Sequence, residues 1–303
     1  MSMGKVLITG AGGLMGRYVA KELEGRAELH GFDVVPDPEP GRYARYVQGC
    51  IEDFDKVREA VQGCDLVVQI AARPNIWSGA EHEIIATNVP GTWNVLAAAE
   101  AAGVKRAVIT SSDSTVGYTV LQSRMIPPEY LPVDNKHPLH PTDAYAASKV
   151  MTEQVGRTFL DRGKLDVVAI RPVYVLYPEF ECEVVARAAD PEGYVGPAAG
   201  GRQPAGGGVM WHYVDPRDLA RAFRLALEKD TPGFGPYFIS GPNTLHPTPT
   251  VENLANRMGG RRIPVKKPAV YEQNPFAPIY DLDDAKNGLG FFPEHDLRAK
   301  LVG

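Results

Sequence analysis

The sequence contains little cysteine, no long apolar run and no strong excess of one charge. Its three cysteines, Cys50, Cys64 and Cys182, lie far apart and form no Cys-x-x-Cys pair. This spacing favours a reducing compartment and argues against structural zinc. No apolar run approaches the roughly 18 residues of a membrane span, and the N-terminal Met-Ser-Met-Gly-Lys leads into a strand-like run without a signal-peptide core. We therefore expect a cytoplasmic protein that does not associate with membranes.

Charge and composition are those of an ordinary globular chain. The 303 residues include 32 Lys+Arg and 37 Asp+Glu, a formal net charge of -5, which argues against a general nucleic-acid binder. Glycine and proline number 31 and 26, too few for a disordered chain, and 44% of the residues are hydrophobic. At roughly 150 residues per domain, the length suggests one large domain or two intimate ones.

Short β-branched runs alternate with longer helical patterns through the first half of the chain. Lys5–Thr9 has no alternating polar positions, which is typical of a strand buried on both faces. The alternation predicts right-handed crossovers and an α/β fold with a parallel sheet. We expect strands over Lys5–Thr9, Glu28–Asp33, Leu66–Ile70, Ala107–Ser111 and Asp166–Arg171, and helices over Leu14–Leu23, Ile84–Ala102 and Ala144–Arg162.

Two segments interrupt this alternation. Residues 113–143 are rich in proline and polar side chains, and connections of this length are often functional. The segment includes His137 and His140, but no third ligand is nearby in sequence, so we expect no metal site. Gly196–Gly208 is too rich in glycine for regular structure and is interpreted either as a mobile lid or as a surface loop.

A glycine-rich turn follows the first predicted strand. Gly10, Gly13 and Gly16 are spaced three apart between that strand and the helix after it. The first glycine allows a sharp turn, the second lets a pyrophosphate approach the backbone, and the third lets the helix pack close to the sheet. Asp33 ends the next strand, where a carboxylate accepts hydrogen bonds from an adenosine ribose and repels a 2′-phosphate. The pattern predicts a dinucleotide site that prefers NAD to NADP.

A tyrosine and a lysine at the start of a predicted helix suggest proton-transfer chemistry. Tyr145 and Lys149 are four residues apart, so they lie on one helix face. A neighbouring ammonium lowers the pKa of a phenol, so Tyr145 could exchange a proton with a substrate hydroxyl. The strand before this helix delivers Ser112 to the carboxyl edge of the sheet, where its hydroxyl could hold the reacting oxygen.

Taken together, these motifs resemble the extended short-chain dehydrogenase/reductases, the NAD-dependent epimerase/dehydratase family. The resemblance is strongest from Gly4 to Pro172. It implies a Rossmann-type doubly wound parallel sheet in residues 1–171, with a small C-terminal α/β substrate-binding part in 172–303 from which about 210–240 returns to the core. The matching pieces are Thr9 to Gly16, Gln69-Ile-Ala-Ala72, Asn88 to Val95, Ser111-Ser112, Tyr145 to Lys149, Ile170-Arg-Pro172 and Asp218-Leu-Ala220.

The resemblance also assigns roles to individual residues. Ser112, Tyr145 and Lys149 would be catalytic, with Lys149 also bound to the nicotinamide ribose. The family commonly forms homodimers through two helices, which correspond here to about Ile84–Ala102 and Ala144–Arg162. NAD would lie against Gly10, Gly13, Leu14, Met15, Gly16, Asp33, Cys50, Ile51, Ala71, Ala72, Tyr145, Lys149 and Pro172.

Several positions depart from the family pattern. Gly49-Cys50-Ile51 lacks the acid that usually lies near the adenine amine, and Asp113 takes the place of the catalytic Ser or Thr. The Ser-Ser-Asp sequence is similar to that of the uronate and hexose dehydrogenase branch, which uses the second serine. We therefore expect Ser112 to be catalytic and Asp113 to contact the substrate; the alternative is that Asp113 holds the reacting oxygen.

Two aromatic residues bear on the substrate. Tyr174 and Trp211 replace the Asn and Arg that hold a diphosphate in sugar-nucleotide enzymes of the family, and aromatic rings suit a sugar face instead. We therefore expect both to contact a carbohydrate without a nucleotide. The alternative is that Trp211 packs in the core and that Arg202 or Arg217 binds phosphate.

The leading hypothesis is an NAD-dependent oxidoreductase acting on a secondary alcohol or carbonyl of a sugar or sugar acid. One alternative is a nucleotide-sugar epimerase or dehydratase that holds NAD tightly. Another is a non-catalytic NAD(H)-sensing protein, although such relatives typically lose the tyrosine.

Overall fold

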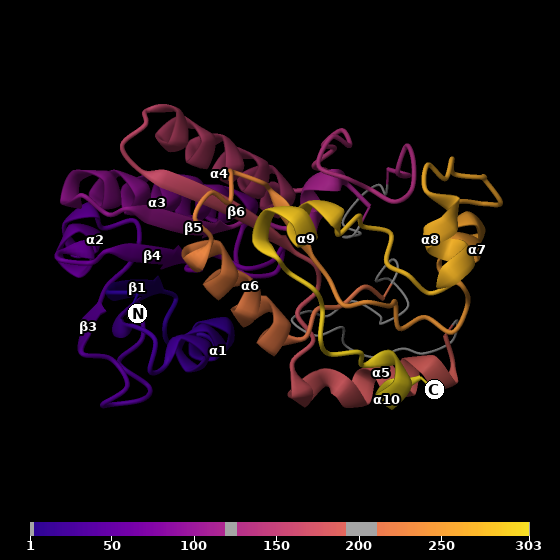
Figure 1. Ribbon diagram of the computed structural model, residues 1–303, viewed down its shortest axis with the longest axis horizontal. Coiled ribbons are helices and arrows are strands. Elements are labelled where there is room, and N and C mark those ends of the chain that lie inside the picture. The colour runs from indigo at the N-terminus through magenta and orange to yellow at the C-terminus, as the bar shows by residue number, and fades with distance from the viewer. Residues whose placement is uncertain (1–2, 119–125, 192–210, 303) are drawn as a thin grey trace.

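A parallel β-sheet forms the centre of the computed structural model, which describes residues 3–118, 126–191 and 211–302 (Figure 1). Within those residues the sheet has seven strands in the order β3-β2-β1-β4-β5-β6-β7, and every neighbouring pair is parallel. The apolar run Val6-Leu7-Ile8 is buried on both faces, as a central parallel strand requires. The strands are β1 (Lys5–Thr9), β2 (Glu28–Asp33), β3 (Arg45–Gln48), β4 (Leu66–Gln69), β5 (Arg106–Thr110), β6 (Asp166–Pro172) and β7 (Tyr237–Ile239).

Helices cover both faces of this sheet. α2 (Phe54–Val61), α3 (Glu81–Ala102) and α4 (Ala144–Asp161) lie on one face, and α1 (Leu14–Leu23) and α6 (Pro216–Glu228) lie on the other (Figure 1). α1 shows why such helices pack: Met15, Val19 and Leu23 recur at helical spacing and are all buried. The doubly wound Rossmann-type fold predicted from the sequence is thereby confirmed.

The expected elements differ from the observed ones by a few residues at most. The largest shift is at the start of α3, which begins at Glu81 instead of Ile84. The sequence patterns predict neither β3 and α2 nor β7 and the helices after α4. β3 is a short edge strand in which only Val47 is buried, so its apolar pattern is weak.

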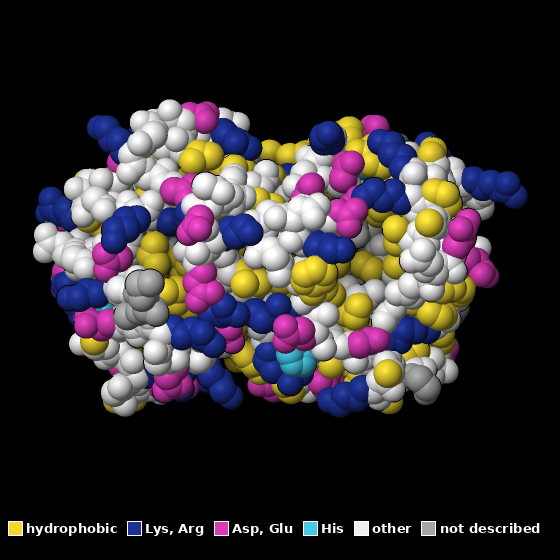
Figure 2. Space-filling model, viewed as in Figure 1, with side chains coloured by type: hydrophobic (Ala, Val, Ile, Leu, Met, Phe, Trp, Pro, Cys, Tyr) yellow, Lys and Arg dark blue, Asp and Glu magenta, His cyan; other side chains and the backbone are white. Residues whose placement is uncertain are grey.

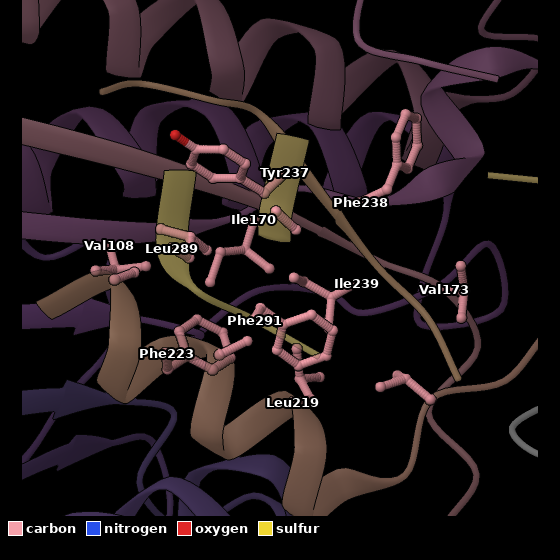
Figure 3. Packing of buried hydrophobic residues seen from close by; sticks show 14 of the residues in the cluster. Val108, Ile170, Val173, Leu219, Phe223, Tyr237, Phe238, Ile239, Leu289 and Phe291 are labelled. Atoms are coloured by element: carbon pink, nitrogen blue, oxygen red, sulfur yellow. The ribbon is translucent and has the colours of Figure 1, made fainter. Parts of the chain in front are cut away.

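An apolar layer between the sheet and α6 extends to the C-terminal segment. Figure 3 shows Leu219 and Phe223 of α6 gathered with Ile170 of β6 and with Phe291, which follows α9 (Asp283–Leu289). Phe223 and Phe291 are no more than 1% exposed. Truncation of a buried Phe to Ala costs about 3–5 kcal/mol, so this layer fastens the end of the chain to the sheet.

The C-terminal part has a smaller core of its own. It carries η2 (Pro178–Phe180), α5 (Glu181–Ala189), α7 (Thr250–Arg257), α8 (Pro268–Gln273) and α10 (Arg298–Leu301). The buried carboxylate of Asp218, in the first turn of α6, accepts the backbone N–H groups of Glu294 and His295 and so ties this part to the sheet layers. The small core consists of Leu176, Val184, Trp211, Tyr213, Leu245, Leu297 and Leu301.

Residues 192–210, which include Gly196–Gly208, the predicted lid or surface loop, lie outside the described residues. Among the helices that the structure describes, none combines the length and apolarity needed to cross a bilayer. On the face seen in Figure 2, Lys and Arg side chains are interspersed with Asp and Glu.

Candidate active site

The carboxyl ends of the central strands meet at one edge of the sheet. The strand order reverses between β1 and β4, and open parallel sheets bind ligands in the crevice at such a reversal. The two strand ends are joined there by Thr9, whose hydroxyl accepts the backbone N–H groups of Ile70 and Ala71, each at 3.2 Å. The glycine turn, Ala71, Ala72 and the Ser112 segment all follow strands that end at this edge.

The glycine turn leaves an open approach to the first turn of α1. Gly10 has φ 76°, a left-handed conformation that favours glycine. A Cβ on Gly16 would collide with the backbone of Gly10 and Ala11, so only glycine lets α1 sit this close. A Cβ on Gly13 would approach only the Gly10 carbonyl oxygen, at 3.3 Å. Gly13 is the N-cap and no side chain caps the helix, so its first N–H groups can receive an anion.

Asp33 lies at the end of β2, directly beside that turn. Its Oδ2 accepts the Gly12 N–H at 2.9 Å and its Oδ1 accepts the Val35 N–H at 3.3 Å. The carboxylate is half-buried and held in one orientation by the backbone. It can still accept hydrogen bonds from the hydroxyls of a ribose, because a carboxylate offers about four acceptor positions.

The other predicted cofactor contacts surround this edge. Leu14 is 40% exposed, whereas Met15 and Pro172 are buried, and Ala71 and Ala72 are half-buried.

The segment after β3 has no acid in the usual place near adenine. Cys50 donates through its thiol to Glu52, and Ile51 is buried. Asp53 accepts the Lys56 N–H as the N-cap of α2, so its carboxylate serves the helix.

α4 presents Tyr145 and Lys149 on one face. The helix begins where Asp143 accepts the Ala146 N–H at 2.8 Å. Lys149 is buried, its Nζ donates to the Thr110 carbonyl oxygen at 2.8 Å, and it lies 5.7 Å from the centroid of the Tyr145 ring. Burial lowers the pKa of Lys149 to about 8. The structure therefore brings the predicted pair together at the carboxyl edge of β5.

Ser112 and Asp113 face the same place from the end of β5. Burial raises the pKa of the Tyr145 phenol, and the neighbouring Ser112 hydroxyl lowers it in part. Ser112 Oγ lies 3.3 Å from Asp113 Oδ1. Asp113 begins the short helix η1 (Asp113–Val116), and burial raises the pKa of its carboxyl to about 6.

Three residues that support the site were given no role from the sequence, although two of them, Asn88 and Arg171, lie in segments that match the family. Glu153 continues the Tyr145 and Lys149 face of α4 and forms a bidentate ion pair with Arg171, at 2.7 and 2.8 Å. Asn88 of α3 donates to the Ser148 hydroxyl at 2.9 Å and so links α3 to the turn of α4 that carries Tyr145 and Lys149. The i+4 spacing from Lys149 was the available signal for Glu153.

A fourth such residue comes from the far end of the chain. The Tyr280 hydroxyl donates to Asp113 Oδ2 at 2.9 Å across 167 residues of sequence. Its ring stacks on Phe238 with centroids 4.6 Å apart. No local pattern identified this residue.

The two predicted aromatic substrate contacts lie in different surroundings. Tyr174, just after β6, is 41% exposed. Trp211 is only 6% exposed and belongs to the C-terminal core, where Arg187 lies over its ring and His246 packs against its edge. These surroundings match the packing interpretation of Trp211, and a substrate contact stays a prediction. Arg217 is engaged by Asp215 at 2.7 Å, and Arg202 lies outside the described residues.

The histidines of the proline-rich segment have local partners. His137 accepts the Glu129 N–H at 3.0 Å through Nε2, and its Nδ1 contacts the Pro138 carbonyl oxygen. In residues 3–118, 126–191 and 211–302, no cluster of three or more His, Cys, Asp or Glu side chains is arranged to hold a metal ion.

Residues 6–239 match the sequence profile of the NAD dependent epimerase/dehydratase family. The chain belongs to this family. A similar curated protein is 3 beta-hydroxysteroid dehydrogenase/Delta 5-->4-isomerase of Monkeypox virus, which is 33% identical over 54% of this chain and 50% of the viral protein. The chain thus spans about half the length of the viral relatives that it matches.

This chain is also similar to sugar dehydrogenases. Uronate dehydrogenase of Pseudomonas putida is 30% identical over 55% of this chain and 59% of the relative. L-arabinose 1-dehydrogenase (NAD(P)(+)) of Haloferax volcanii is 30% identical over 76% of this chain and 85% of the relative. The solved structure of MoeE5 in complex with UDP-glucuronic acid and NAD has a TM-score of 0.70 at 20% identity, covering 98% and 96% of the two chains, and so shares the fold.

NAD is the cofactor of this family member. The described residues fit it: the cradle at Gly13 is one that a side chain would fill, the N-terminus of α1 is free of side-chain caps, and Asp33 is oriented beside the turn. Bound NAD supplies the acceptor or donor of a hydride.

Proposed function

We propose that this protein is an NAD-dependent oxidoreductase that interconverts a secondary alcohol and a carbonyl on a sugar or a sugar-acid-like substrate. The observation that carries the proposal is the convergence of Ser112, Tyr145 and Lys149 at the sheet edge beside the glycine turn. A hydroxyl donor, a phenol and an ammonium at one place are the groups that proton exchange with an alcohol needs.

Each of the three groups has a separate task. Tyr145 exchanges a proton with the substrate oxygen, and Ser112 positions that oxygen. Lys149, charged below its pKa of about 8, stabilises the phenolate form of Tyr145 and binds the nicotinamide ribose.

The substrate class rests on two supports. Two relatives are named as dehydrogenases of L-arabinose and of a uronate. In addition, Trp211 stands where the family carries a diphosphate-binding Arg, and Arg217, one of the alternative phosphate ligands, is paired with Asp215.

Asp33 supports a preference for NAD over NADP. A 2′-phosphate would lie against a carboxylate that is already fixed by Gly12 and Val35, and like charges at this distance repel.

We further propose a cytoplasmic homodimer that pairs through α3 and α4. These helices pack on each other and expose Trp93 and Met151, which are 41% and 46% exposed. Light scattering of the wild type and of Trp93→Glu tests the pairing: we expect twice the monomer mass for the first and a loss of mass for the second. A wild-type mass equal to that of a monomer would contradict the proposed homodimer.

A panel of sugars, uronic acids and nucleotide sugars with NAD, followed by NADH absorbance, tests the activity. We expect NADH with a nucleotide-free sugar or sugar acid, and Tyr145→Phe should lower turnover by about 100-fold or more while NAD still binds. Retained turnover in Tyr145→Phe would exclude the mechanism. An epimerase would instead keep NAD through purification without net NADH, and a sensor would bind NAD and turn over nothing in the panel.

A further inference from the structure

Two consecutive residues hold the end of β5 against α4. The Thr110 carbonyl oxygen accepts a hydrogen bond from Lys149 Nζ at 2.8 Å, and the Ser111 hydroxyl donates to Glu153 Oε1 at 2.5 Å. The next residue, Ser112, carries the hydroxyl that the proposed function assigns to the substrate oxygen. The contact between Ser111 and Glu153 therefore lies between the two points at which this strand end reaches the active site.

Glu153 lies on the face of α4 that carries the two reactive groups. Tyr145, Lys149 and Glu153 follow each other at steps of four residues, so they lie one turn apart along one side of the helix. Lys149 and Glu153 are only 3% and 7% exposed. The carboxylate is thus one turn beyond the lysine, where little water is present to screen its charge.

The carboxylate of Glu153 is fixed in orientation by three hydrogen bonds. Arg171 of β6 donates to Oε1 from Nε at 2.7 Å and to Oε2 from Nη2 at 2.8 Å, and this bidentate arrangement fixes the plane of the carboxylate. The third bond, from Ser111, has the length of a charge-assisted O–H···O⁻ bond. Because a serine hydroxyl has a single donor proton, this contact fixes the Ser111 side chain as well.

Stability alone does not account for a buried ion pair at this place. Replacing such a pair by apolar side chains of similar volume is often neutral or stabilising, because the desolvation of two charges offsets their attraction. A buried pair can instead select one geometry among several similar ones. Here the geometry that the pair selects is the position of the β5 end relative to α4.

We propose that Glu153 is a positioning residue for the reaction: it holds Lys149 in place from one turn away and, through Ser111, it holds the end of β5 that carries Ser112. The inference rests on the proposed function and adds to it the residues that keep its catalytic groups in register. Glu153 and Ser111 exchange no proton with the substrate in this role.

The charge of Glu153 also acts on Lys149. Burial lowers the pKa of Lys149 to about 8, and the Glu153 carboxylate raises it in part. The ammonium form, on which the proposed role of Lys149 depends, is therefore supported by Glu153. The titratable, charged and polar side chains on this side of the site are Tyr145 and Glu153 on α4, Arg171 on β6, Asp113 on η1, Asn88 on α3 and Ser111 after β5.

Steady-state kinetics of Ser111→Ala test the positioning of the strand end. The variant removes one hydroxyl and leaves the ion pair and the lysine in place. We expect kcat and kcat/KM for oxidation to fall together by about 10-fold or more, because a loosened strand end lowers the share of productive geometries without weakening substrate binding.

Ser240→Ala is the matched control. Ser240 directly follows β7, as Ser111 follows β5, and both are fully buried, but the Ser240 hydroxyl donates to the Tyr213 carbonyl oxygen at 3.4 Å. The kcat of this control should remain at the wild-type value. Wild-type kcat in Ser111→Ala, or an equal loss of kcat in Ser240→Ala, would overturn the inference.

A titration of Lys149 tests the role of Glu153 without substrate or cofactor. In protein labelled with ¹³C-lysine, the Lys149 signal is the one that Lys149→Met removes, and it should titrate near pH 8, below the ordinary value of about 10.4. Glu153→Gln keeps the shape of the side chain and removes its charge, so the midpoint should move to lower pH, whereas Ser240→Ala should leave it unchanged. A midpoint that stays in place in Glu153→Gln would show that Glu153 does not act on Lys149 and would also overturn the inference.

The two proposals fail in different ways. If Ser111→Ala and Glu153→Gln keep the wild-type thermal transition and the wild-type kcat, the positioning role is wrong while the oxidoreductase stands. If the wild type oxidises no substrate in the panel, the proposed function fails, and the Lys149 titration still decides whether Glu153 acts on Lys149.

Discussion

The two ends of the sheet edge that carries the candidate active site are built in different ways. At β1 and β2 the turn from Gly10 to Gly16 and Asp33 are arranged by backbone groups close in sequence. At β5 and β6 the site depends on buried side chains that meet from separate elements, such as Glu153 with Arg171. We define the first as the backbone region and the second as the side-chain region. A cofactor shared by many enzymes can be held by backbone, whereas the chemistry of one reaction needs particular side chains.

The largest expected effect is on the side-chain region, where the ion pair is buried. Glu153→Ala leaves Arg171 without its carboxylate partner, and Arg171 is only 2% exposed. Breaking one side of a buried pair costs about 3–5 kcal/mol in the free energy of unfolding, which urea denaturation measures.

Glu59→Ala is the control for this change. Glu59 pairs with Lys56 on the surface of α2, where both side chains are nearly half exposed. An exposed pair contributes roughly 0–1 kcal/mol. Equal losses of unfolding free energy in the two variants would show that the buried pair contributes no more to stability than an exposed pair.

The backbone region should respond to single glycine changes with a loss of cofactor binding. Gly16→Ala places a Cβ against the Gly10 and Ala11 backbone, so we expect both lower stability and about 10–100-fold weaker NAD binding. Gly13→Ala meets only the Gly10 carbonyl oxygen, at 3.3 Å, and should weaken NAD binding with little change in stability. Isothermal titration and thermal unfolding separate the two effects; unchanged NAD affinity in both variants contradicts the assigned phosphate cradle.

The smallest expected effect is a change of cofactor preference. Asp33→Asn removes the charge that repels a 2′-phosphate while keeping an acceptor for the ribose. The ratio of NAD to NADP affinity should fall by about 10-fold, or roughly 1.4 kcal/mol. The measurement is competitive binding of the two cofactors. An unchanged affinity ratio would show that Asp33 does not discriminate between NAD and NADP.

Sequence was a better guide to the backbone region than to the side-chain region. The glycine spacing and the i, i+4 pair of Tyr145 and Lys149 are local patterns, so they indicate their geometry directly. Tyr280 meets Asp113 across 167 residues, and only the folded chain brings them together. Trp211 illustrates the same limit: its position in the sequence leaves a substrate contact and core packing both open, and only the folded chain shows that it lies in the C-terminal core.

The transfer of a labelled hydride tests the central claim most directly. A substrate carrying deuterium on its carbinol carbon is mixed with NAD and the wild-type protein, and the nicotinamide product is examined by mass spectrometry. The account predicts that one deuterium appears in NADH and that Tyr145→Phe transfers almost none. Deuterium that stays in or returns to the sugar, or that reaches NAD equally well in Tyr145→Phe, would contradict net oxidation through Tyr145.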